Sequence, residues 1–184
     1  MVAANPLAAP VRGPLPRVVG RRVPGDRQHE HQGPPLCRRR KRGAEAQAIG
    51  RSRGGRTTKI HAVCDASGRP VALEVTKGQL GDVRAATGLL ARLPSSRLCA
   101  GDTAYDADGL RQFLQDRGST PVIPNNPTRK RFHPFDEEAY KHRNLIERMF
   151  CRLKDWRRIA TRYDKLARNF LSTVALAAAI IWWT

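Results

Sequence analysis

Apolar residues recur every three or four positions between Tyr140 and Arg158, in a stretch that contains neither Pro nor Gly. Ile146, Met149, Phe150 and Leu153 follow the i, i+3, i+4, i+7 spacing that places apolar side chains on one face of a helix. The acidic run 136–138 comes directly before this stretch, where negative charge suits the positive end of a helix dipole. The pattern therefore predicts one long amphipathic helix near the C-terminus.

The region before this helix alternates between strand-like and helix-like patterns. Period-2 alternation predicts a hairpin whose strands are 57–63 and 71–76, joined by a turn over Asp65 to Gly68. His61 and Asp65 receive structural roles from this pattern, in the strand and in the turn. Further elements are predicted in the following order: a helix over 82–92 with Asp82 as N-cap, a strand over 97–101, a helix over 106–117 with Asp106 as N-cap, and a strand over 120–123. The fold class is therefore mixed α/β with one sheet.

A second stripe of side chains runs beside the apolar face of the long helix. Tyr140, Arg143, Glu147 and Lys154 fall within a narrow arc at roughly 100° per residue. A carboxylate that can hold a divalent metal, next to two cations that can hold a phosphodiester, suits phosphate chemistry. The pattern alone favours the simpler interpretation, which is a solvated charged face with ion pairs.

The spacing of these four residues changes that balance. The order Tyr-x2-Arg-x3-Glu-x6-Lys, where x is any residue, resembles the Y-R-E-K signature of insertion-sequence DDE transposases of the IS-four superfamily. The flanking text from Asn144 to Trp183 is similar to the C-terminus of the IS-five kind. The resemblance implies that Glu147 is the last acidic residue of a metal triad. The segment 101–106, GDTAYD, resembles the A-D-K-G-Y-D segment of this family, which implies that Asp102 is the second.

The resemblance also implies a ribonuclease H-like (integrase-like) fold, a mixed sheet with flanking helices. In that fold the first Asp lies on a central first strand, and no matching strand is evident here. Residues 1–43 are rich in Pro, Arg and Gly and lack periodicity, so we expect a disordered or frame-shifted segment, followed by a partial catalytic domain over 44–184. Gln28 to Pro35, QHEHQGPP, can be encoded by text that gives D-S-T-S-I-R-A-H in a neighbouring frame. We therefore expect the first strand and the first catalytic Asp to be missing; a genuine basic tail is the alternative.

Composition supports a polyanionic partner. The chain has 184 residues, with 34 Lys and Arg against 16 Asp and Glu and a net charge of +18, which favours DNA. Four scattered cysteines without a C-x-x-C pair favour a reducing cytoplasm and argue against a zinc ribbon. The apolar run 171–183 is too short to span a bilayer and predicts a buried helix, so no membrane partner is expected.

The family resemblance implies metal-dependent phosphodiester hydrolysis and strand transfer at insertion-sequence ends. Asp102 and Glu147 would be ligands of Mg²⁺ or Mn²⁺, Arg143 and Lys154 would orient phosphates, and Tyr140 would position the strand. It further implies terminal repeats and target DNA as partners, a homodimer in the intact family, and a bacterial, nucleoid-associated location. Two basic segments are candidate DNA contacts: the Gly-rich loop with Arg51, Arg53 and Arg56, for which a flexible turn is an equal alternative, and the loop with Arg129, Lys130 and Arg131.

Without a first Asp this chain is expected to be a poor enzyme, so the sequence leaves its activity open. The alternative is a non-catalytic basic DNA-binding protein that inhibits transposition. A basic structural or ribosome-associated protein is a third class, against which the four-residue signature together with Asp102 argues.

Overall fold

A computed structural model describes residues 17–22, 44–52 and 55–184 of the chain. Its strands form one mixed sheet, ordered β2-β3-β1-β5-β6, with β4 on β3. β1 is antiparallel to β3 and parallel to β5, which is parallel to β6. The bounds are β1 Arg17–Arg22, β2 Gly50–Ser52, β3 Gly55–Cys64, β4 Pro70–Lys77, β5 Leu98–Ala100 and β6 Thr120–Val122. β1 thus lies at the centre of the sheet with β5, the strand that precedes Asp102, as its parallel neighbour, which agrees with the ribonuclease H-like fold expected from the sequence.

The first strand is present, which corrects the expectation that it would be missing. β1, Arg17–Arg22, lies between β3 and β5 with Val18 opposite Cys64 on one side and opposite Ala100 on the other. Its sequence, RVVGRR, has only two apolar side chains and one Gly, so it shows no strand-like alternation. β1 contains no acidic residue, so the strand is there without a carboxylate. The remainder of the segment 1–43 lies outside the described residues.

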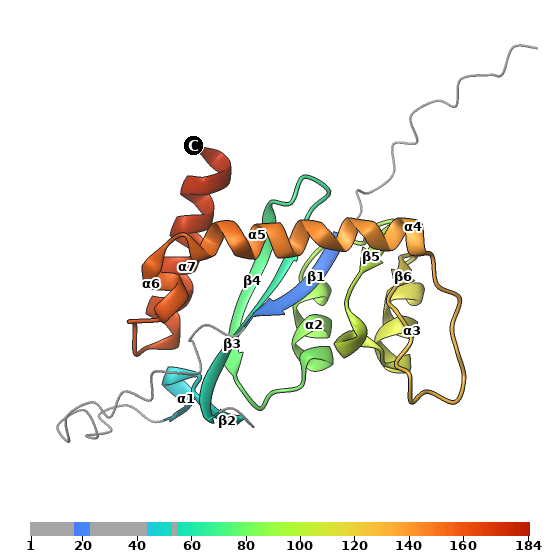
Figure 1. Cartoon of the computed structure of the whole chain (residues 1–184), viewed down its shortest axis with the longest axis horizontal. Coiled ribbons are helices and arrows are strands. Elements are labelled where there is room, and N and C mark those ends of the chain that lie inside the picture. The colour runs from blue at the N-terminus through green and yellow to red at the C-terminus, as the bar shows by residue number, and fades with distance from the viewer. Residues whose placement is uncertain (1–16, 23–43, 53–54) are drawn as a thin grey trace, which may run out of the picture.

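Helices cover both faces of the sheet. They are α1 Ala44–Gln47, α2 Asp82–Ala91, α3 Asp108–Asp116, α4 Glu137–Tyr140, α5 Asn144–Lys154, α6 Arg157–Thr161 and α7 Ala167–Trp183, with short 3-10 turns η2 Thr103–Tyr105 and η3 Lys141–Arg143. Figure 1 shows α5 lying across the strands, with α6 and α7 at one end of the molecule and the loop between β6 and α4 at the other.

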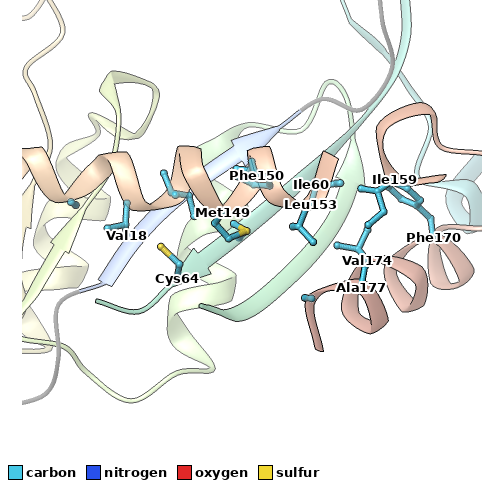
Figure 2. Close-up of a cluster of buried hydrophobic side chains, with 14 of the residues drawn as sticks. Val18, Ile60, Cys64, Met149, Phe150, Leu153, Ile159, Phe170, Val174 and Ala177 are labelled. Carbon is cyan, nitrogen blue, oxygen red and sulfur yellow. The ribbon is translucent and has the colours of Figure 1, made fainter. Parts of the chain in front are cut away.

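Alternation along the strands separates two apolar cores. Val18 of β1 packs with α5, α6 and α7, whereas its neighbour Val19 packs with α2 and α3 on the opposite face. Ala100 and Cys99 of β5 divide in the same way. Figure 2 shows the first core, in which Met149, Phe150 and Leu153 of α5 meet the sheet. The apolar face predicted for the long helix is thus buried, as Ile146, Met149, Phe150 and Leu153 all are.

Several sequence predictions are confirmed and others are corrected. The hairpin appears as β3 and β4, and Asp65 holds its turn by accepting hydrogen bonds from Ser67 N and Arg69 N. His61 is buried and hydrogen-bonded to Thr76 through Nε2, at 2.8 Å. Asp82 is not the N-cap of α2; Gly81 is, and the Asp82 carboxylate pairs instead with Lys59 at 2.9 Å.

The C-terminal apolar run lies within α7, whose Phe170, Val174, Ala177 and Ala178 are buried. Among the described residues, no helix combines the length and apolar character needed to cross a membrane.

Candidate functional site

The charged stripe is carried by a helix that is almost continuous. The Asp136 carboxylate caps α4 by accepting a hydrogen bond from Ala139 N at 2.9 Å. From Tyr140 to Asn144 the backbone stays in the right-handed region through η3, so α4 leads directly into α5. The helix ends at Lys154 rather than at Arg158, since Trp156 is extended. This break lets α6 change direction and bury Ile159 in the same core as Leu153.

Three of the four stripe residues contact one another in a row. Arg143 donates to Glu147 Oε1 at 2.6 Å, across one helical turn. The Arg143 guanidinium also lies over the Tyr140 ring, 5.5 Å from its centroid. Glu147 is 53% exposed, so the rest of its carboxylate is open to a ligand. Lys154 lies seven residues further along, about 10 Å by helical rise.

Asp102 approaches the same region from the sheet. It follows β5, and its Oδ1 accepts from Ala104 N at 2.9 Å, which caps η2. Because Val18 pairs with Ala100 in parallel register, the position next to Asp102 on β1 is Gly20. A Cβ built on Gly20 would lie 2.7 Å from Ile146 Cγ1. Helix α5 therefore passes β1 next to Asp102, and the residue after Ile146 is Glu147.

The pKa of Tyr140 is influenced by residues from both elements. Burial raises the pKa of the phenol, Arg143 opposes that rise, and the negative charges of Asp102 and Glu147 add to it. Both carboxylates thus lie near enough to act on one hydroxyl group, although 45 residues separate them in the chain. Phe135 fixes the Tyr140 ring by an edge contact, with centroids 5.1 Å apart.

The site offers two hard oxygen ligands to a cation. One or two carboxylates, completed by waters and substrate phosphates, suffice for a Mg²⁺ ion, so the donor chemistry of Asp102 and Glu147 suits such an ion. Within the described ranges no group of three acidic, His or Cys side chains has the geometry to hold a metal. Asp65 lies away from these two carboxylates, because it follows Cys64 beside the start of β1, whereas Asp102 follows β5 toward the end of β1.

Asp106 is not a helix N-cap, which corrects the sequence prediction. Ala107 precedes α3 in that role, and the Asp106 side chain is fully buried. It pairs with Arg111 at 2.8 Å and with Arg129 at 2.9 Å. These donors, together with Asn126 N, hold the pKa of the carboxyl below its ordinary value against the opposing effect of burial, which is the largest single influence.

The two basic segments differ in how they present their cations. In the loop before α4, Arg129 is engaged by Asp106 and Asp108, while Lys130 and Arg131 are exposed. In the other segment, Arg51 and Arg56 form a cross-strand pair of the β2–β3 hairpin and are both exposed, and Arg53 lies outside the described residues.

Two residues of this region were missed by sequence reasoning. Arg111 is buried at 2% exposure, and only an Asp five residues earlier signals its partner. Phe132 is 69% exposed within the run RKRFH. An aromatic residue inside a basic run was the available signal, because nucleic-acid surfaces often combine the two.

Several known proteins are similar to this chain. The chain is 43% identical to a protein from Brucella ovis that is described as a transposase for insertion sequence element IS6501. The 127 aligned residues span 68% of this chain and 98% of that protein. A second relative, described as a transposase for insertion sequence element IS402 from Burkholderia cepacia, is 29% identical over 137 residues, which span 68% of this chain and 63% of the relative. Among solved structures, the catalytic core domain of BIV integrase has a TM-score of 0.44 and 16% identity, over 66% of this chain and 73% of that one. The family model described as "Transposase DDE domain" matches residues 22–182. The chain therefore belongs to the DDE transposase domain family.

Proposed function

We propose that this chain acts in DNA transposition, through metal-dependent phosphodiester hydrolysis and strand transfer at insertion-sequence ends. The observation that carries the proposal is that α5, which bears the Arg143–Glu147 pair, passes close to β1 beside the end of β5, where Asp102 lies. Family membership supports it independently, because transposases of this family act on DNA and use divalent metal ions.

Each residue of the site receives a role. Asp102 and Glu147 hold Mg²⁺ or Mn²⁺, which when bound supplies Lewis-acid activation of oxygens at the scissile phosphorus. Arg143 already orients Glu147 and presents its remaining N–H groups to a phosphate. Lys154 binds the backbone farther along the same helix face, and Tyr140 positions the strand.

A second candidate is a non-catalytic DNA-binding protein that inhibits transposition. It is favoured by β1, which occupies the central position of the sheet without an acidic residue. A metal site with two carboxylates binds its ion more weakly than one with three, and loss of one catalytic group commonly costs orders of magnitude in rate. The net charge of +18 serves this function equally well.

Strand cleavage and joining in Mn²⁺ separates the two candidates. The substrate is a duplex bearing the terminal repeats of the element that encodes this chain. Activity abolished by Glu147→Gln and by Asp102→Asn supports the enzyme. The matched control is Glu138→Gln, an exposed acid-to-amide change on the preceding turn, whose side chain pairs only with Lys141 among the described residues. Salt-sensitive binding without cleavage, indifferent to Glu147→Gln, supports the inhibitor instead.

The proposal extends to organisation and location. We propose that residues 44–184 together with β1 form the catalytic portion, that the chain forms a homodimer on DNA, and that it acts in the bacterial cytoplasm at the nucleoid. For the segment 1–43, the frame-shift hypothesis stands as a prediction about the coding DNA. A neighbouring frame over residues 27–31 that reads D-S-T supports it, and the absence of such a frame favours a genuine basic tail.

A further inference from the structure

The loop between β6 and α4 is built as a rigid platform. Asn125 and His133 bridge its base in both directions: Asn125 Nδ2 donates to His133 O, and His133 N donates to Asn125 Oδ1, each at 2.9 Å. Within the loop, Asn126 Oδ1 accepts from both the backbone N and the hydroxyl of Thr128. Such side-chain-to-backbone bonds fix a turn that has no sheet or helix of its own.

Two carboxylates anchor this platform to the body of the protein. Asp106, whose side chain is fully buried, accepts from Asn126 N at 2.7 Å and from Arg129 Nε at 2.9 Å. Arg129 also pairs with Asp108 at 2.6 Å, and His133 Nε2 lies 2.9 Å from the same carboxylate. The Arg129 guanidinium is therefore engaged by two carboxylates of the protein. We expect it to position the loop.

The anchored loop presents three neighbouring side chains to solvent. Lys130 and Arg131 are exposed and have no ion pair within the described part of the chain. Phe132 is 69% exposed, more than any other large apolar side chain that the structure describes. A single exposed apolar residue needs no explanation by itself. Here, however, the exposed aromatic ring lies beside two unpaired cations on an anchored loop, and this combination is typical of surfaces that bind single-stranded nucleic acid.

The platform is tied to the catalytic residues at both of its ends. Its anchor, Asp106, comes four residues after Asp102 in the chain. On the other side, Phe135 contacts the Tyr140 ring. Figure 1 shows this loop at the end of the molecule where α4 begins. We therefore expect a nucleotide held by the loop to belong to the same DNA as a phosphate held by Arg143.

We propose that Lys130, Arg131 and Phe132 form a single-strand DNA contact in which Phe132 stacks on an unpaired base. Lys130 and Arg131 bind the flanking phosphates. Aromatic rings accept any base on their face, and cations follow the backbone, so this contact selects unpaired DNA without selecting sequence. The inference rests on the proposed function only in that the partner is DNA.

Binding without metal tests the contact separately from catalysis. The full chain is titrated, in EDTA, against a fluorescent single strand and a blunt duplex of mixed sequence, each of about 20 nucleotides or base pairs, which exceeds the site size of one such contact. Phe132→Ala should weaken single-strand binding about 5- to 150-fold, the loss of one stacked base, and leave the duplex and the salt dependence unchanged. Phe132→Trp should retain the affinity.

The matched control is Trp183→Ala. Trp183 is 57% exposed on α7, at the opposite end of the molecule from the loop. Replacing both Lys130 and Arg131 by Ala should make the negative slope of log affinity against log salt shallower by about 1.4 for the single strand. Because all these side chains are exposed, the variants are expected to unfold at the wild-type denaturant midpoint.

The outcomes are distinct. A Phe132→Ala variant that binds the single strand as tightly as Trp183→Ala does overturns the stacking contact, even where the salt slope becomes shallower as expected. Equal losses on single strand and duplex overturn it as well, since the base faces inside a duplex are already stacked on one another. If the wild-type chain binds neither DNA, both the proposed function and this inference are refuted. If Glu147→Gln loses cleavage but binds the single strand normally, both remain in place.

Discussion

At the scale of single residues, the absence of a side chain at Gly20 decides how closely α5 approaches the sheet. A methyl group there would lie 2.7 Å from Ile146 Cγ1. Gly20→Ala should therefore lower the free energy of unfolding by about 1–3 kcal/mol, the usual cost of overpacking, as measured by urea denaturation. Ile146→Ala in the same chain should relieve part of the overlap, so the two changes together should cost less than their sum.

Gly88 is the control for this prediction. It lies inside α2, and no atom comes within 4 Å of the Cβ that an Ala would add. Gly88→Ala should raise the free energy of unfolding by about 1 kcal/mol, since only the helix propensity changes. A Gly20→Ala variant that is stabilised to the same degree would contradict the close approach of α5 to β1.

The Asp106 carboxylate gives the protein a predictable response to acid. Its pKa is held below the ordinary value by Asn126 N, Arg111 and Arg129, against the opposing effect of burial. A depressed pKa means that the ionised group stabilises the fold above the unfolded-state pKa of about 3.9, and that this stabilisation is lost as pH falls through the lower folded value. Asp106→Asn should therefore be less stable than wild type at neutral pH, with the difference shrinking below about pH 4. A difference that stays constant with pH would contradict this account.

At the scale of elements, Arg162 joins the C-terminal helices to the start of the sheet. Its guanidinium donates to Thr58 Oγ1 and to Gln47 O, and it lies 5.0 Å from the centroid of Phe170. Its backbone is left-handed, at φ 47°. Arg162→Ala should destabilise the protein by about 2–4 kcal/mol, because it removes two charged hydrogen bonds and the contact of the guanidinium with Phe170.

Comparison of Arg162→Gly with Arg162→Ala separates the backbone from the side chain. Both variants lose the same contacts, but Gly adopts a positive φ without strain, so it should be more stable than Ala by about 1 kcal/mol. Arg158→Ala serves as a control, because that side chain is 64% exposed and its pair with Asp164 is long, at 3.3 Å. Equal stabilities of the Gly and Ala variants would show that the left-handed backbone is relaxed in solution.

The elements that the sequence predicted well are those whose burial leaves a clear period. The β3–β4 hairpin and the apolar face of α5 alternate or repeat as buried strands and helices do. β1 escaped prediction because a central strand of six residues with three Arg and one Gly lacks that period. Its place comes from pairing on both edges with β3 and β5. Asp106 was misassigned because its partner Arg129 is distant in the chain.

At the scale of the whole molecule, exposed cations occur at widely separated places. The β2–β3 hairpin carries Arg51 and Arg56, and Figure 1 shows it far from the loop that carries Lys130 and Arg131. An excess of positive charge at one place would suit a short anionic ligand, whereas separated groups suit an extended polyanion. We therefore propose that DNA follows a path across the molecule, which the net charge of +18 supports.

This arrangement predicts additive losses on duplex DNA. Replacing Arg51 and Arg56 by Ala should make the negative slope of log affinity against log salt shallower by about 1.8. The loss of affinity should be equal for all sequences, because only phosphates are contacted. Adding the Lys130 and Arg131 replacements should make the slope shallower still, since distant sites act independently. Arg84→Ala, an exposed cation on α2, should leave it unchanged. If one DNA molecule used only one of the two places, the second pair of replacements would have no effect, and a continuous path would be excluded.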